Sequence, residues 1–289
     1  MKYLNQKSFF VFSAVAAIAL CMITKPAASQ TSGPVRLAYS YPADKPVKYI
    51  STSKILQDMD INGQIISVNV SAILGCSVKG LGKDNNDLVL EIKIDTLAQT
   101  IDSPGGLMGG EMKEVAGKSF TMKILPTGKE TDISGAEKIT FTNYEGVSNT
   151  LKESFTEFFP DLPAEALAPG YTWPSTDTIS NKTATTDIFM IIHSENKFEG
   201  YEKLNGINCA RISYTLSGSR DVKTQNQGMD IKMKGPMNGT GELFFAPDKG
   251  YFLKQVIKIR MTGQVEITSP EVMSFPVTLD QSSVTETKD

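Results

Sequence analysis

The sharpest arrangement of metal-ligating residue types is the stretch Asp58-Met59-Asp60-Ile61-Asn62-Gly63. Side-chain oxygens at alternate positions before a glycine open the calcium-binding loop of EF-hand proteins. The position that should carry a bidentate glutamate is Asn69, and the residues after the glycine alternate as a strand. Asn-Gly is also the preferred corner of a two-residue β-hairpin. We therefore expect a hairpin corner here, with neither a metal nor a cofactor bound.

The chain offers little for catalysis or metal binding by histidine. The sequence contains one histidine, His193, so a Ser-His-Asp or Cys-His mechanism would depend on that residue alone. A zinc site with several imidazoles is excluded for the same reason. His193 follows the apolar run 188–192, and we expect it to end a buried strand.

Carboxylates offer the remaining enzymatic chemistry. A glycosidase needs two of them projecting into one cleft, and the candidates are Glu153, Glu157, Asp161 and Glu165. Their spacing places them on the solvent side of an amphipathic segment. The chain also lacks a phosphate-binding glycine loop and a nucleophile elbow. We expect no catalytic residues and a non-enzymatic protein, with a carboxylate-based hydrolase as the enzymatic alternative.

Apolar side chains supply the candidate ligand-binding residues. An apolar stripe at helical spacing predicts a helix over 147–159 that Pro160 ends, followed by a second short helical turn over 161–167. The glycine-rich stretch 103–117 interrupts the strand pattern and fits either a plain surface loop or a mobile flap whose methionines adapt to an apolar ligand. The residues we expect to line a ligand site are Phe155, Phe158, Phe159, Trp173, Met108 and Met112.

Long β-strands must position these residues. Apolar and polar residues alternate through most of the chain, as in Leu88 to Ile94, which is typical of half-buried strands. The fold class is therefore mainly β: a large curved antiparallel sheet or open half-barrel of long meandering strands, with one or two helices covering the concave face. We expect strands at 47–59, 65–81, 88–101, 120–125, 198–204, 207–216, 229–233, 239–246, 251–262 and 272–284, with 217–227 looping out.

The first thirty residues predict the cellular location of the chain. Lys2 and Lys7 precede an apolar run over 9–23 and small residues at 27–29, which is the pattern of a cleaved secretory signal peptide. We assign 1–29 to the signal peptide and expect a periplasmic or secreted mature chain without a transmembrane span. A lipid-anchored form would use Cys21, but the preceding Leu20 is not the small residue that lipoprotein processing requires.

The mature chain, 30–289, is expected to form a single β-rich domain. It can be divided into two similar β halves, about 36–142 and 184–285, joined by a helical segment at about 146–170. Its two cysteines, Cys76 and Cys209, could pair or remain separate buried thiols. The formal net charge of −3 offers no basic field, so we expect no nucleic-acid partner.

The order of turns resembles a group of secreted proteins of unknown function from Gram-negative bacteria. The resemblance rests on Lys45-Pro46-Val47-Lys48-Tyr49, Leu125-Pro126-Thr127-Gly128-Lys129, Leu162-Pro163, Ala168-Pro169-Gly170-Tyr171-Thr172-Trp173, Gly239-Thr240-Gly241 and Pro247-Asp248-Lys249-Gly250. The architecture is similar to the lipoprotein-carrier (LolA/LolB-like) fold. That resemblance implies an apolar cavity suited to lipid or acyl chains, and it carries no catalytic residues.

Two functions therefore follow from the sequence. The first is binding of a lipid or other apolar small molecule in the hollow of a curved sheet. The second is an interaction or assembly module with an envelope protein as partner, in which side chains fill the hollow.

We predict that the secreted protein begins within a few residues of Gln30. Intact-mass measurement of the protein from its native host tests this directly. A diacylated N-terminal Cys21 would contradict the signal-peptide assignment, because it would identify a lipid anchor instead.

Overall fold

The computed structural model describes residues 34–142, 148–182, 186–226, 229–269 and 272–288. Thr31–Asp289 form one compact unit. The predicted signal peptide lies outside the described residues. Within those residues, the structure has no helix that is both long and apolar enough to cross a membrane.

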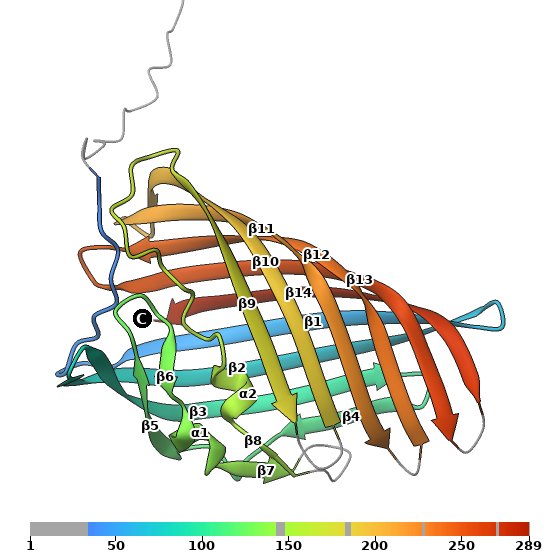
Figure 1. Ribbon diagram of the computed structural model, residues 1–289. Helices are drawn as coiled ribbons and strands as arrows, with labels where there is room; N and C mark the ends of the chain where they lie inside the picture. The colour runs from blue at the N-terminus through green and yellow to red at the C-terminus, as the bar shows by residue number, and fades with distance from the viewer. Residues whose placement is uncertain (1–33, 143–147, 183–185, 227–228, 270–271, 289) are drawn as a thin grey trace, which may run out of the picture. The chain divides into compact units, whose positions relative to one another are not determined.

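One twelve-stranded antiparallel sheet dominates the structure (Figure 1). Its first meander contains β1 (Val47–Ile61), β2 (Gln64–Asp84), β3 (Asp87–Ser103), β5 (Ser119–Ile124) and β6 (Glu130–Asp132), with β4 (Gly106–Glu111) paired to β3. Its second meander contains β9 (Thr172–Lys182), β10 (Thr186–Leu204), β11 (Ile207–Asn226), β12 (Met229–Ala246), β13 (Tyr251–Ser269) and β14 (Met273–Lys288). Pairing between β1 and β14 joins the meanders. The sheet is open, ending at β6 and β9, which confirms the predicted fold class.

The predicted hairpin corner at Asn62-Gly63 is confirmed, and a second Asn-Gly corner joins β10 to β11. Asn62 and Gly63 have φ of 56° and 84°, and Asn205 and Gly206 have φ of 50° and 80°. Positive φ at both central residues is the requirement of a type I′ turn. The Gly63 N–H donates to Asp60 Oδ1 at 2.8 Å, so this carboxylate stabilises the corner of the hairpin.

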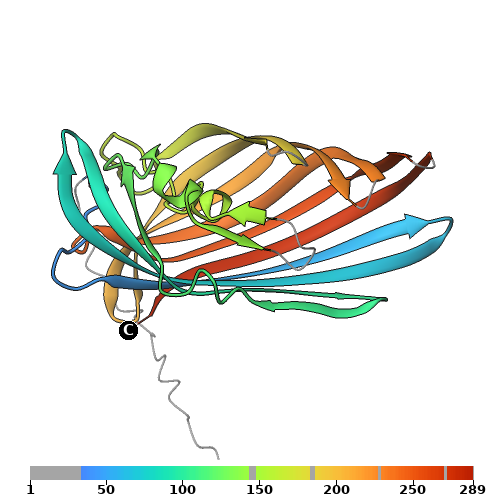
Figure 2. The ribbon, with the colours of Figure 1, turned by 90° about the horizontal axis from the view of Figure 1, so that it is seen from below.

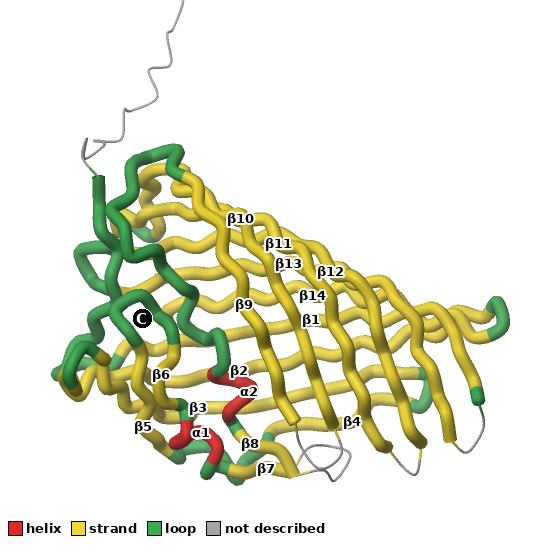
Figure 3. Tube along the Cα trace, viewed as in Figure 1, coloured by secondary structure: helices red, strands yellow, loops and turns green. Residues whose placement is uncertain are grey.

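The segment between the two meanders covers part of the concave face (Figures 2 and 3). It contains α1 (Ser134–Glu137), β7 (Thr140–Thr142), β8 (Ser148–Thr150) and α2 (Lys152–Phe155). The two short helices agree with the prediction of one or two helices on this face.

The predicted lengths of the helices are wrong. Only α2 forms within 147–159, and the first of these residues lies outside the described part. Pairing of β8 with β7 replaces the start of the helix. Thr156 is extended, with a ψ of 124°, and Glu157 has a φ of 60°, so the helix ends at Phe155. The expected turn over 161–167 is also absent from the described structure, where Leu167 instead forms an isolated β-bridge with Val35.

Four further predictions are wrong, three of them because neighbouring strands override local signals. Part of the glycine-rich 103–117 stretch forms β4, and the polar 217–227 stretch continues β11 as far as Asn226. The chain also becomes β earlier than expected, at β9. His193 lies inside β10 and does not end a buried strand. Its side chain is exposed, and its Nδ1 lies 3.0 Å from Thr176 Oγ1.

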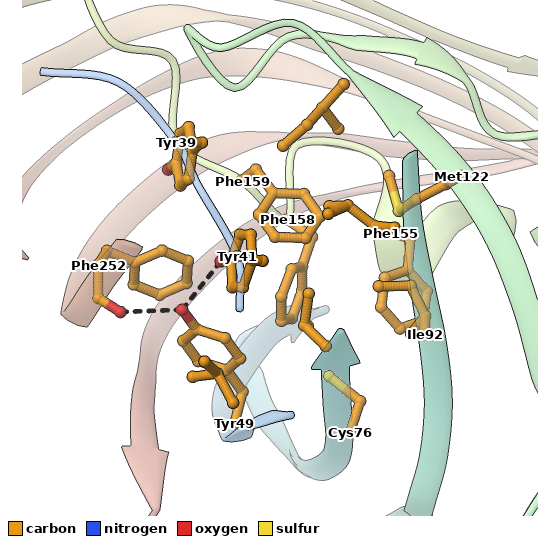
Figure 4. Packing of buried hydrophobic residues seen from close by; sticks show 14 of the residues in the cluster. Tyr39, Tyr41, Tyr49, Cys76, Ile92, Met122, Phe155, Phe158, Phe159 and Phe252 are labelled. Atoms are coloured by element: carbon orange, nitrogen blue, oxygen red, sulfur yellow. Dashed lines mark hydrogen bonds between the residues drawn. The ribbon is translucent and has the colours of Figure 1, made fainter. Parts of the chain in front are cut away.

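An aromatic core fills one end of the hollow (Figure 4). Tyr49 is its polar centre: its hydroxyl donates to the Phe252 carbonyl at 2.9 Å and lies 2.9 Å from the Tyr41 hydroxyl. The N-terminal segment 34–46 closes this end through backbone bonds, among them the Tyr39 N–H to the Pro126 carbonyl at 2.7 Å.

The two mature cysteines are separate buried thiols. Cys76 belongs to the aromatic core, whereas Cys209 belongs to a second cluster of buried residues with Phe244 and Leu253. Burial raises the pKa of both thiols, that of Cys209 to about 11. The structure therefore favours the unpaired alternative over a disulfide.

We expect Phe155→Ala to lower the free energy of unfolding by about 3–5 kcal/mol, because its ring is fully buried against Phe120 and Phe158. Chemical denaturation measures the change. Phe189→Ala is the matched control, since this ring is 43% exposed, and its cost should stay below about 1 kcal/mol. Equal costs for the two variants would contradict the packing described.

Candidate ligand site in the hollow of the sheet

The predicted aromatic site residues pack against one another. Phe158 lies 5.1 Å from both Phe155 and Phe159, measured between ring centroids, and the latter two side chains are fully buried. Trp173 packs against the same core from β9 and stacks on Tyr171. These side chains fill their end of the hollow, and a ligand-binding role for them stays a prediction.

The two predicted methionines separate. Met112 is buried in the aromatic core, and its N–H donates to the Leu97 carbonyl at 2.8 Å. Met108 lies on β4 and is 45% exposed. The structure thus brings five of the six candidate residues into one core and leaves Met108 outside it.

Beyond the aromatic core, the concave face continues as an apolar surface whose side chains are buried or partly accessible, and we call it the trough. The strand register places inward-facing side chains in rows across the sheet, such as Met237, Met261 and Leu279. The next rows contain Val265, Phe275 and Val277. The partly buried side chains that pack around these two clusters are Ile55, Met59, Ile61, Ile192, Ile231, Met233, Ile259 and Ile267.

A cavity of about 590 Å³ lies between α2 and the trough. Lys152, Glu153 and Thr156 line it from the α2 side. Its apolar lining comes from six strands, β1, β9, β10, β12, β13 and β14: Ile55, Ile179, Ile188, Met190, Ile192, Met237, Ile259, Met261 and Leu279. A pocket of this size and composition is typical of small-molecule binding sites.

A polar band separates the aromatic core from the trough. Ser283 Oγ donates to Ser53 Oγ at 2.9 Å, and Thr285 Oγ1 donates to Ser51 Oγ at 2.9 Å. Gln281, which lines the cavity, donates from Nε2 to Ser283 Oγ at 3.2 Å. Hydrogen bonding within the band satisfies these polar groups on an otherwise apolar face.

One cationic side chain lies on the trough itself. Arg220 of β11 lines the cavity, and burial lowers the pKa of its guanidinium, while the Glu153 carboxylate acts in the opposite direction. Its Nε is buried and has no hydrogen-bond partner in the described part of the chain. A buried donor without a partner costs free energy that an acceptor in the cavity could recover.

A group of carboxylates lies near the aromatic core, where Glu130 is close to Glu157 and Asp161. Burial raises the pKa of Glu130 to about 7, of Glu157 to about 8 and of Asp161 to about 6, with carboxylate neighbours adding to each shift. Glu153, Glu157, Asp161 and Glu165 are exposed residues, as predicted, so the carboxyl groups of Glu157 and Asp161 are only partly desolvated by their neighbours. Glu130 differs, since it is only partly exposed and its Oε1 is buried without a hydrogen-bond partner among the described residues.

Two larger hollows, of about 770 and 640 Å³, lie on the outer face of the sheet. Their lining includes outward-facing polar side chains such as Lys54, Lys258 and Glu242. They are more open than the cavity in the trough, so a bound apolar molecule would remain exposed to water. We therefore assign the candidate site to the trough.

Part of the trough had a sequence signal. Ile188, Met190 and Ile192 lie in a continuous apolar run, which indicates a strand but does not show which of its faces points inward. Arg220 had no such signal, because it lies in the polar stretch expected to loop out.

No protein-family model matches the sequence, and no curated protein matches it. Among solved structures, the chain is weakly similar to the beta domain of the Bordetella autotransporter BrkA, with a TM-score of 0.24, 8% identity and coverage of 85% of this chain and 100% of the other. It also weakly resembles a DUF1329 family protein from Desulfovibrio piger, with a TM-score of 0.19, 11% identity and coverage of 80% of this chain and 83% of the other. These scores are too low to carry an argument about function.

We predict that ionisation of Glu130 destabilises the fold. Its folded pKa, about 7, is above its usual value, so its contribution to stability is fully present below about pH 4 and is lost as the pH rises through 7. Between pH 5 and pH 8.5 the wild type should therefore lose on the order of 1–2 kcal/mol more unfolding free energy than Glu130→Gln. Denaturant titrations at both pH values measure this difference. Parallel losses in the two proteins would contradict the shifted pKa.

Proposed function

We propose that the protein is a non-enzymatic, secreted or periplasmic binding protein that holds a lipid or other apolar molecule in the trough. The observation that carries the proposal is the cavity of about 590 Å³ with an apolar lining on the concave face. The predicted signal peptide supports the extracytoplasmic location.

Apolar burial provides the driving force for this binding. Each Å² of apolar surface removed from water contributes roughly 25 cal/mol, and both the ligand and the trough would lose water contact. Met190, Met237 and Met261 lie among the lining residues. Their flexible thioether side chains can adapt to acyl chains of different shape.

The distribution of packing favours ligand binding over an assembly module with a filled hollow. Packed side chains close the end that holds the aromatic core. The other end retains the cavity, and the side chains around it, including Ile55, Ile192 and Ile259, remain partly accessible. An apolar face of this kind needs an occupant to exclude water.

The double variant Met190→Gln/Ile259→Gln should bind an uncharged apolar probe such as N-phenyl-1-naphthylamine about tenfold more weakly than the wild type, because polar groups replace part of the apolar lining. Fluorescence titration measures the affinity. Phe189→Gln is the matched control, since it lies on β10 beside Met190 but on the outer face.

The control should bind the probe with wild-type affinity. Equal affinities for the double variant and the wild type would place the probe outside the trough and contradict the proposal. Mass spectrometry of lipid extracts from the purified native protein would identify the class of ligand.

A further inference from the structure

Arg220 is a charged side chain on the mainly apolar surface of the trough. It projects from β11 on the same face as Val222 and Leu216, and the cavity it lines is otherwise mainly apolar on its sheet side. The guanidinium of arginine presents a fixed fork of donors that suits the oxygens of a carboxylate or a phosphate.

Two glycines lie on the sheet beside this guanidinium. In the β11–β12 register, Arg220 lies opposite Gly235, and Gly263 follows on β13. The Gly235 and Gly263 backbones approach closely: a Cβ on Gly235 would lie 2.8 Å from the Gly263 Cα and 2.0 Å from the Thr262 carbonyl oxygen. The floor next to Arg220 is therefore made of backbone, without side chains.

The charged groups around the cavity are nearly balanced, but one donor of Arg220 lacks an acceptor among the described residues. The lining of the cavity contains two cations, Lys152 and Arg220, and one carboxylate, Glu153. Lys152 forms an ion pair with Glu137 of α1, and Glu153 lies near enough to affect the pKa of Arg220. The buried Nε of Arg220 still lacks an acceptor within the described chain.

We propose that the ligand is a single-chain amphiphile with an anionic carboxylate or phosphate head group, which Arg220 binds while the acyl chain lies over the trough. This inference rests on the proposed function and specifies its ligand class. A head-group oxygen would satisfy the buried Nε, and the tail would run along Met237, Met261 and Leu279 toward Val265 and Phe275.

Competition against the uncharged probe tests the inference, with laurate, dodecyl phosphate, 1-dodecanol and inorganic phosphate as competitors, each below its aggregation concentration. The wild type should bind laurate or dodecyl phosphate at least tenfold more tightly than 1-dodecanol, because hydrogen bonds from Arg220 to an anionic head group strengthen binding by about this much. Inorganic phosphate should not displace the probe, because it has no tail.

Arg220→Gln should lose the preference for the anionic head group while it retains wild-type affinity for 1-dodecanol, and Arg220→Lys should restore part of the preference. Arg260→Gln is the matched control, since Arg260 faces outward on β13 and pairs with Asp280. Circular dichroism and thermal unfolding verify that each variant is folded. If Arg220→Gln does not fold, the head-group preference of Arg220→Lys is compared with that of the wild type. A weaker preference in Arg220→Lys supports the role of Arg220.

The outcomes separate the two proposals. Equal binding of laurate and 1-dodecanol by the wild type, or an unchanged preference in the folded Arg220 variants, would overturn the role of Arg220 and leave apolar binding intact. Failure of every amphiphile and of the probe to bind would overturn the proposed function itself.

Discussion

The structure depends on how one apolar sheet face is kept from water. Twelve paired strands place alternate residues on the concave side, and an antiparallel sheet is stable when that side is covered. Among the described residues, the segment between the meanders contributes two four-residue helices and two three-residue strands to this cover. It is too short to cover the whole face, so the aromatic core fills one end and the trough remains at the other.

Pairing between β1 and β14 determines where that division falls. These strands connect the first meander to the second across the middle of the sheet. At one end of the pair, Tyr49 bonds to Phe252 and packs against Phe158. At the other end, Met59 lies opposite Val277 within the apolar rows. The same two strands thus contribute to the packed core and to the candidate site, with the serine and threonine band between them.

Much of the sheet could be predicted from the sequence because its signals are local. Alternation in Leu88 to Ile94 and the Asn-Gly corners at 62–63 and 205–206 specify strands and turns without reference to the rest of the fold. The long helix could not be predicted correctly, since pairing of β8 with β7 and the positive φ of Glu157 are tertiary outcomes.

The candidate site was harder to predict than the sheet. Phe155, Phe158 and Phe159 are buried, as aromatic residues at helical spacing suggest, but burial alone does not distinguish a core from a binding site. The trough appears only once the register brings Ile192, Met237 and Met261 into one row from distant parts of the sequence. Arg220 lies in a polar stretch whose inward face only the neighbouring strands define.

Photo-crosslinking tests the central claim most directly, namely that the trough binds an apolar molecule. An uncharged long-chain diazirine should, after irradiation and peptide mass spectrometry, label inward-facing residues of the trough such as Met190 and Met261. Excess unlabelled ligand should suppress this labelling. Labelling confined to outward-facing residues such as Leu56 and Phe189, or unaffected by competitor, would contradict the account.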